Sequence, residues 1–158
     1  MADETLLEND PRNPCVGCGP ENPVGLRLAF RRLGDRVETR LAAAEHHQGW
    51  PGRLHSGVLY LAMLETANWT VYGLTGRVGL PTRTSALGLA RWVRVGETLT
   101  LTGRRDAEGA VRVEAADAEG RVVATLERAY EMVDRATFLT RMGYDEVPAG
   151  LEEALPEG

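Results

Sequence analysis

Apolar and polar residues alternate in the first part of the chain that looks folded. The segment 25–32 places Leu26, Leu28 and Phe30 on one face and Arg27 and Arg31 on the other, and Val37, Thr39 and Leu41 repeat the alternation. Gly34 and Asp35 stand between the two runs and form a turn sequence. A period of two is typical of strands with one buried face, so this region predicts a β-hairpin.

A long apolar segment without this alternation follows. Residues 57–72 contain no proline and place apolar side chains on every face of a helix. Ser56 suits the N-cap, while Gly73 and Gly76 end the run. The pattern predicts one main helix, about 25 Å long at 1.5 Å per residue. A helix that is apolar all round must be enclosed by other structure.

The second half of the chain provides segments that can enclose this helix. Two copies of the turn sequence Asp-Ala-Glu-Gly separate runs rich in strand-forming residues, and a short helix is expected from the N-cap Asp134 to Met142. The predicted strands cover residues 84–95, 98–104, 110–116 and 121–133. Together with the hairpin they predict an α+β fold, in which an antiparallel sheet wraps around one long central helix. The exposed edges of such a sheet favour at least a dimer.

The two ends of the chain differ in composition from its middle. Residues 1–14 are polar and contain two prolines, whereas residues 144–158 form an acidic tail that is also interrupted by proline. Such segments bury little apolar surface and are expected to be loosely held. The predicted folded domain therefore spans residues 15–143.

Charge and hydropathy exclude several classes of function. The 158-residue chain carries a net charge of −5, which gives no overall attraction to nucleic acid. No run approaches the ~20 apolar residues of a membrane span, and the acidic N-terminus lacks the features of a secretory signal. We expect a cytoplasmic protein without nucleic-acid or membrane partners. All 18 basic residues are arginine, so guanidinium groups, helix N-termini or backbone amides must bind any anionic ligand.

Three stretches of the sequence carry a family resemblance. They are CVGCGPENPVGLRLAF at 15–30, HHQGWPGRLHSGVLYLAMLETANWTVYG at 46–73 and VRVGETLTLTGR at 93–104. Together with the order of elements, they resemble the hotdog-fold acyl-CoA thioesterase superfamily, in particular its phenylacetate-pathway-like branch with an N-terminal CxxCG segment. The resemblance implies a hotdog fold, an acyl-CoA substrate, and a homodimer or homotetramer with sites at the dimer interface.

The resemblance also implies two catalytic groups on the central helix. The N–H of Gly57 would polarise the thioester carbonyl, because the first N–H groups of a helix are unpaired and lie at its positive end. The usual carboxylate lies nine residues after His55, where this chain has Leu64. Glu65 follows it, about 100° further round the helix. Either Glu65 still reaches the thioester, or this member has lost the standard acid.

The candidate site residues have both functional and structural interpretations. Glu65 can act as a general base or nucleophile, or it can be a buried acid satisfied by Asn68 or by an arginine across the dimer. Asn68 would line whatever Glu65 faces. The hydroxyl of Thr84 can hold the attacking water, and Arg83 and Arg91 can bind the CoA phosphates. His55 can orient the loop before the helix or touch the thioester oxygen, or it can be a capping or dimer-contact histidine.

Cys15 and Cys18 form half of a tetrahedral zinc site. His46, His47 or His55 would complete it if the N-terminal loop folds over the helix start, with His47 as the leading candidate. The alternative is a pair of reduced structural thiols. The residues after the second cysteine cannot continue a helix, so a thioredoxin-like redox motif is disfavoured. Catalysis itself is expected to require no cofactor, and any zinc would be structural.

Three functions fit the sequence. The first is hydrolysis of an acyl-CoA or related thioester by a helix N-terminal oxyanion hole and a helix carboxylate. The second is non-catalytic binding of an acyl-CoA on the same scaffold, which Leu64 at the usual acid position favours. The third is an enoyl thioester hydratase or dehydratase that uses a histidine and Glu65 as acid and base.

Overall fold

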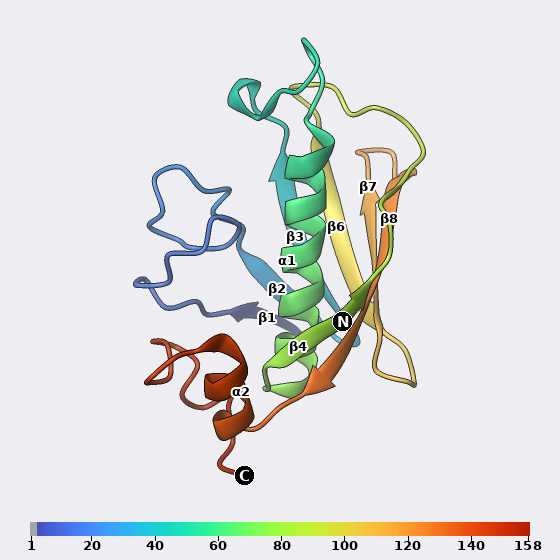
Figure 1. Cartoon of the computed structure of the whole chain (residues 1–158). Coiled ribbons are helices and arrows are strands. Elements are labelled where there is room, and N and C mark those ends of the chain that lie inside the picture. The colour runs from blue at the N-terminus through green and yellow to red at the C-terminus, as the bar shows by residue number, and fades with distance from the viewer. Residues whose placement is uncertain (1–2) are drawn as a thin grey trace.

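The computed structural model describes residues 3–158 and shows a curved sheet around one long helix (Figure 1). The long helix α1 lies against the concave face of the sheet, and the short helix α2 packs near the C-terminus. In chain order the elements are β1 (Glu4–Leu7), β2 (Phe30–Leu33), β3 (Arg36–Ala42), the 3-10 turn η1 (Glu45–His47), α1 (Ser56–Thr75), β4 (Gly79–Thr84), β5 (Gly88–Leu89), β6 (Thr98–Arg105), β7 (Val111–Ala116), β8 (Val122–Met132) and α2 (Arg135–Met142).

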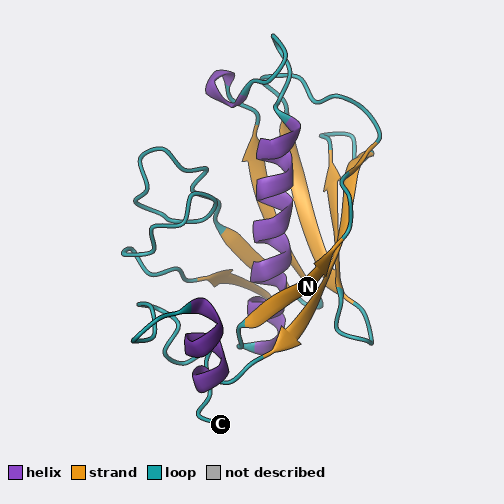
Figure 2. Ribbon diagram, in the orientation of Figure 1, coloured by secondary structure: helices purple, strands orange, loops and turns teal. Residues whose placement is uncertain are grey.

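The strands form one antiparallel sheet of eight strands (Figure 2). Their order is β1-β2-β3-β6-β7-β8-β4, and the short β5 also pairs with β8. Consecutive strands are neighbours from β6 to β8, as the two Asp-Ala-Glu-Gly turns predicted. The helix interrupts this order between β3 and β4, so β3 pairs with β6. The α+β arrangement with a central helix is confirmed.

The helix is held against the sheet by a continuous apolar contact. Its sheet-facing side chains pack on β3, β6 and β7, and β6 carries a glycine, Gly103, beneath Thr70. A Cβ on Gly103 would overlap the Thr70 hydroxyl, so the glycine permits close approach of helix and sheet. The buried helix residues are Leu59, Ala62, Met63, Thr66, Ala67, Thr70 and Val71.

The helix start differs from the prediction in one detail. His55, not Ser56, is the N-cap, and its Nδ1 accepts a hydrogen bond of 2.8 Å from the Gly57 N–H. Ser56 is instead the first helical residue. At the other end, Gly76 adopts the left-handed conformation expected of a helix C-cap.

Two predicted strands are shorter than expected. The segment 84–95 contains only the end of β4 and the two-residue β5, because β4 begins earlier, at Gly79. The first hairpin strand begins at Phe30, since the backbone N–H groups of Leu26 and Leu28 bond to carbonyls of the N-terminal loop and not to a neighbouring strand. Leu28 is still buried, so the apolar pattern correctly indicated a buried side chain, although the residue lies outside the strand.

The described parts of both terminal segments pack against the rest of the molecule, although these segments were expected to be loosely held. Within 1–14, the strand β1 pairs with β2 and extends the sheet. In the segment 144–158, Ala154 and Leu155 are buried, and Leu155 packs with Phe138 of α2. The Val78 N–H donates to the Ala154 carbonyl, so the C-terminal segment is tied to the start of β4.

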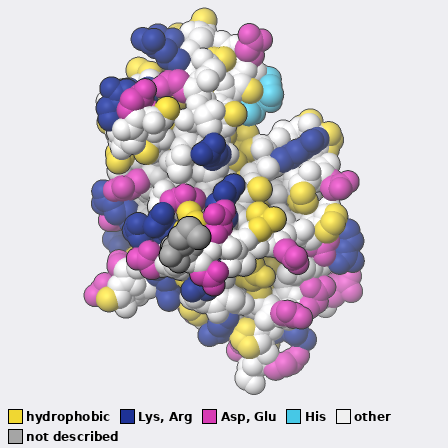
Figure 3. Space-filling model, turned by 180° about the vertical axis from the view of Figure 1, so that it is seen from behind, with side chains coloured by type: hydrophobic (Ala, Val, Ile, Leu, Met, Phe, Trp, Pro, Cys, Tyr) yellow, Lys and Arg dark blue, Asp and Glu magenta, His cyan; other side chains and the backbone are white. Residues whose placement is uncertain are grey.

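The surface carries charges of both signs. Acidic and basic side chains are interspersed over the face seen from behind in Figure 3. Charges mixed in this way produce no strong single-sign field over that face. Among the helices of residues 3–158, none is long and apolar enough to cross a membrane.

Candidate functional site

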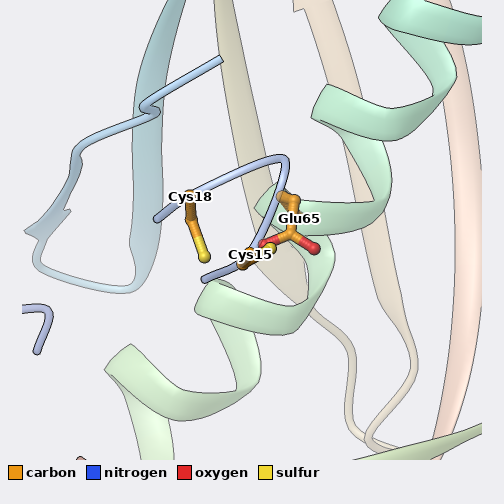
Figure 4. A group of neighbouring side chains, drawn as sticks. All are labelled: Cys15, Cys18 and Glu65. Carbon is orange, nitrogen blue, oxygen red and sulfur yellow. The ribbon is translucent and has the colours of Figure 1, made fainter. Parts of the chain in front are cut away.

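Glu65 lies near the middle of α1 beneath the N-terminal loop that contains the two cysteines (Figure 4). The loop passes so close that a Cβ on Gly17 would overlap Cγ of Glu65. Only a glycine lets the loop cover the acid at this distance. The loop thus explains why an acid can sit on a helix that is apolar on every side: the chain folds its own polar segment over it.

Backbone hydrogen bonds hold this loop in place. The carbonyls of Val16 and Gly17 accept from the N–H groups of Leu26 and Leu28, and the Gly19 N–H closes a turn onto the Cys15 carbonyl. These bonds explain why the alternating segment 25–30 is only partly a strand. These bonds make the loop a fixed part of the site.

Burial dominates the environment of Glu65, which also contains the two thiols and the charge of Arg128. Burial raises the pKa of Glu65 to about 7. Hydrogen bonding with Cys18 and with the backbone N–H groups of Cys18 and Gly17 lowers the pKa of Cys15 to about 5. Cys18 has a raised pKa, first because of its contact with Cys15 and then because of burial. Among residues 3–158, no ion pair is formed by Glu65.

The structure brings together the two predicted thiol ligands but replaces the predicted histidine. Cys15 Sγ, Cys18 Sγ and a carboxylate oxygen of Glu65 all lie within 4.8 Å of one another. His47 is not a member of this group. It stays in η1, where its Nδ1 accepts a weak hydrogen bond from the Ala44 N–H. The N-terminal loop covers the middle of the helix and not its start, so it meets Glu65 before it can reach a histidine.

A cavity of about 360 Å³ lies beside this cluster. Cys18 and Asn68 contribute to its wall, and Glu65 lies one helical turn before Asn68. Trp69 and Tyr72 of α1 continue the wall. The remaining lining comes from both ends of the chain and the start of β4: Glu8, Asn9, Asp10, Arg12, Asn13, Pro14, Val78, Gly79, Leu80, Pro81, Pro148, Ala149, Gly150 and Leu151.

Asn68 is fixed by β8 and not by Glu65. Its Oδ1 accepts hydrogen bonds from the Tyr130 hydroxyl at 2.8 Å and from Arg128 at 3.0 Å. Arg128 also donates to the Thr84 hydroxyl at 3.1 Å, so the predicted water-holding group is already used as an acceptor. No hydrogen bond from Asn68 Nδ2 is formed within the described chain, which leaves that amide group for a ligand in the cavity.

The helix start forms a second, separate hollow of about 380 Å³. Its lining includes His55, Trp50 and Trp92, but not Glu65. The Gly57 N–H, predicted to polarise a thioester, is occupied by the His55 ring. Gly57 and Glu65 are eight residues apart, or about 12 Å along the axis. Within one chain, the two predicted catalytic groups therefore do not share a cavity.

The two predicted phosphate ligands lie outside both cavities. Arg83 is an exposed residue of β4. Arg91 binds two carboxylates, Glu97 at 2.8 Å and Asp117 at 3.0 Å. Because Asp117 is buried, Arg91 is needed there to offset a desolvated charge. The ion pairs show a structural role for Arg91, and its contact with CoA stays a prediction.

Replacing Arg91 by alanine is expected to lower the melting temperature and to flatten its acid dependence. Burial opposes ionisation of Asp117, but hydrogen bonds from Arg91 and from Arg121 lower its pKa from 3.8 to about 2. A pKa that is lower in the folded state stabilises the fold above about pH 4. This stabilisation is lost as the pH falls toward 2. Melting curves between pH 2 and 7 measure this for wild type and Arg91→Ala.

Arg121→Ala is the matched control, because Arg121 binds the same carboxylate from a largely exposed position. Its effect on the melting temperature should be smaller. An Arg91→Ala protein with unchanged melting and unchanged acid slope would contradict the structural role.

Some residues of this region carried no sequence signal. Arg128 and Tyr130 lie in a predicted strand, and neither belongs to a motif. Their roles follow only from the pairing of β8 with β4, which brings Arg128 opposite Thr84. No sequence pattern indicated that Glu65 lies beside the cysteines, although both segments belong to the stretches that carry the family resemblance.

Comparison with known proteins agrees with this architecture. The thioesterase superfamily protein RHA08564 superposes with a TM-score of 0.67 at 24% identity, covering 74% of this chain and 59% of its own. The Escherichia coli PaaI protein from the phenylacetic acid degradation operon gives 0.61 at 13% identity, covering 68% of this chain and 80% of its own. The protein smu.793 from Streptococcus mutans, bound to acetyl CoA, gives 0.56 at 17% identity, covering 63% and 82%.

RHA08564 is a thioesterase superfamily protein, and the likeness to these structures confirms the predicted hotdog fold. This chain spans 59% of the length of RHA08564. No protein-family model matches the chain, and no curated protein sequence matches it significantly. At identities below 25% the likeness establishes the fold, and the activity has to be argued from the site.

Proposed function

We propose that the protein binds an acyl-CoA thioester and hydrolyses it, with Glu65 as the catalytic carboxylate. The observation that carries this proposal is the acid on the central helix of a hotdog fold, next to two residues that line an apolar cavity. A carboxylate in a dry site can activate water or attack a thioester carbon directly. The acetyl CoA bound to smu.793 supports the choice of substrate class.

The cavity beside Asn68 and Trp69 is the proposed acyl site. Its size suits a small ligand, and its wall combines the aromatic rings of Trp69 and Tyr72 with polar side chains of the N-terminal segment and Asn68. The free amide of Asn68 would donate to the thioester oxygen or to the attacking water. Because Glu65 lies one turn from Asn68, a thioester at this end of the cavity would lie close to the acid.

Non-catalytic binding of an acyl-CoA is the second candidate, and two observations favour it. The Gly57 N–H is occupied by His55, so the expected oxyanion donor is engaged. Glu65 is covered by the loop at Gly17 and does not line the cavity. A chain with this arrangement can hold a thioester without turning it over.

A panel of acyl-CoA esters separates the two functions. The purified protein is incubated with aliphatic and aromatic esters, and loss of the thioester absorbance is followed. In parallel, thermal melts are recorded with a CoA thioether that cannot be hydrolysed. Turnover of at least one ester supports the hydrolase. A raised melting temperature without turnover selects the binding protein, and neither response overturns both.

We also propose that the chain self-associates through the free edge of β4. In the monomer β4 pairs only with β8, so its other edge presents unpaired backbone groups. Pro81 removes one donor, and the register shifts between Pro81 and Arg83, so this edge pairs over a short length at most. Light scattering after size exclusion measures the oligomeric state.

A further inference from the structure

Three side chains with metal-binding atoms converge between the N-terminal loop and α1. Cys15 Sγ, Cys18 Sγ and an oxygen of Glu65 lie within 4.8 Å of one another, and Figure 4 shows the three together. In a tetrahedral site with bonds of about 2.3 Å to sulfur and about 2.0 Å to oxygen, ligand atoms are separated by roughly 3.5–3.8 Å. A small inward movement of the three side chains is enough to reach this geometry.

The donor set is selective for one class of cation. Two thiolates and one carboxylate suit a borderline-soft divalent metal such as zinc, whereas magnesium and calcium prefer all-oxygen sites. Three protein ligands leave one tetrahedral position for water or another ligand. Because Cys18 also lines the cavity of about 360 Å³, that position would border the cavity.

Hydrogen-bond donors lie next to both sulfur atoms of the cluster. The Gly17 N–H donates to Cys15 Sγ at 3.3 Å, and the Asn13 amide donates to Cys18 Sγ at 3.6 Å. Donors aimed at sulfur stabilise a thiolate. Within residues 3–158 no salt bridge reaches Glu65, although every member of the cluster can carry negative charge. A bound dication would stabilise the charged forms of all three ligands together.

We propose that Cys15, Cys18 and Glu65 bind one Zn²⁺ per chain, with the fourth position open toward the cavity. The geometry of the loop explains the ligand set: Gly17 lies between the two cysteines and passes directly over Glu65. The site shares Glu65 with the proposed function, but its test involves no acyl-CoA, so failure of one proposal can be told apart from failure of the other. In this site Glu65 is the third protein ligand, a position for which the sequence had suggested His47.

Metal content and a spectroscopic probe test this site in the full chain. The protein is reduced, stripped with a chelator, reconstituted with Zn²⁺ or Co²⁺, and freed of excess metal. We expect one zinc per chain by mass spectrometry of the metal, and a Co²⁺ form with thiolate-to-metal charge-transfer and tetrahedral visible bands. Zinc should also protect both cysteines of the wild type from alkylation.

Variants identify the ligands, with circular dichroism as the check of folding. Cys15→Ser and Cys18→Ser should lose the charge-transfer intensity, and Glu65→Gln should keep both sulfur ligands but weaken Zn²⁺ binding by about 100-fold or more, since even outer-shell losses cost 10–100-fold. His47→Ala is the matched control and should bind as wild type. Substoichiometric zinc with unprotected cysteines in the wild type overturns the proposal. Unchanged affinity in Glu65→Gln, or a loss in His47→Ala, overturns the ligand set.

Discussion

Glu65→Gln is expected to lower the turnover of the best acyl-CoA substrate by about 10²–10⁴-fold, the usual contribution of a positioned acid or base. Glutamine keeps the shape of the side chain but can neither accept the proton of an attacking water nor attack the thioester carbon. The affinity for a CoA thioether should change little, because the carboxylate does not line the cavity. Thioester absorbance gives kcat, and thermal melts with the thioether give binding.

Two further variants interpret that result. Glu65→Asp keeps the charge on a shorter side chain and should retain more activity than Glu65→Gln. Cys15→Ser removes a proposed metal ligand and keeps the carboxylate, so retained hydrolysis in this variant separates the Glu65 effect from metal binding. Wild-type turnover in Glu65→Gln would refute Glu65 as the catalytic group and return attention to the hollow at His55.

Phe30→Ala is expected to lower the free energy of unfolding by about 3–5 kcal/mol, as is usual for a buried aromatic residue. Phe30 is only 1% exposed, and its ring stacks on Trp69 with the centroids 5.2 Å apart. Domains of this size are stable by about 5–15 kcal/mol, so the loss is a large fraction of the total. Urea unfolding followed by circular dichroism measures it.

The same substitution should disturb the cavity, because Trp69 forms part of its wall. Phe30→Leu refills part of the volume and should lose less stability, while Val24→Ala, at an exposed apolar position, should leave stability nearly unchanged. Trp50 and Trp92 are 71% and 50% exposed, so an altered tryptophan emission in Phe30→Ala would report mainly on Trp69. Stability within 1 kcal/mol of the wild type would contradict the packing role.

Several features that depend on interactions between nearby residues were predicted correctly from the sequence. The uninterrupted apolar run from Gly57 to Tyr72 predicted the enclosed helix, and the Asp-Ala-Glu-Gly turns predicted the order of β6, β7 and β8. Asp134 caps α2 as expected, with its side chain accepting from the Thr137 N–H. In each case the deciding interactions lie within a few residues of one another.

Contacts between distant segments could not be predicted in this way. The place of Cys15 and Cys18 depends on how the N-terminal loop crosses α1, and backbone bonds from Leu26 and Leu28 determine that path. The loop meets Glu65 and not His47, so the predicted ligand set failed in its third member. Arg91 looked free for a phosphate, because the sequence does not reveal that Asp117 is buried beside it.

The sequence by itself determined the class of fold, the enclosed helix and the presence of one acid upon it, since side-chain periodicity and turn chemistry are local properties. Only the tertiary structure decided what surrounds that acid: two thiols from a loop some fifty residues earlier, a cavity bordered by Cys18 and Asn68, and a helix start already capped by His55. These are pairings across long separations, and their energies depend on packing that no short window of residues contains.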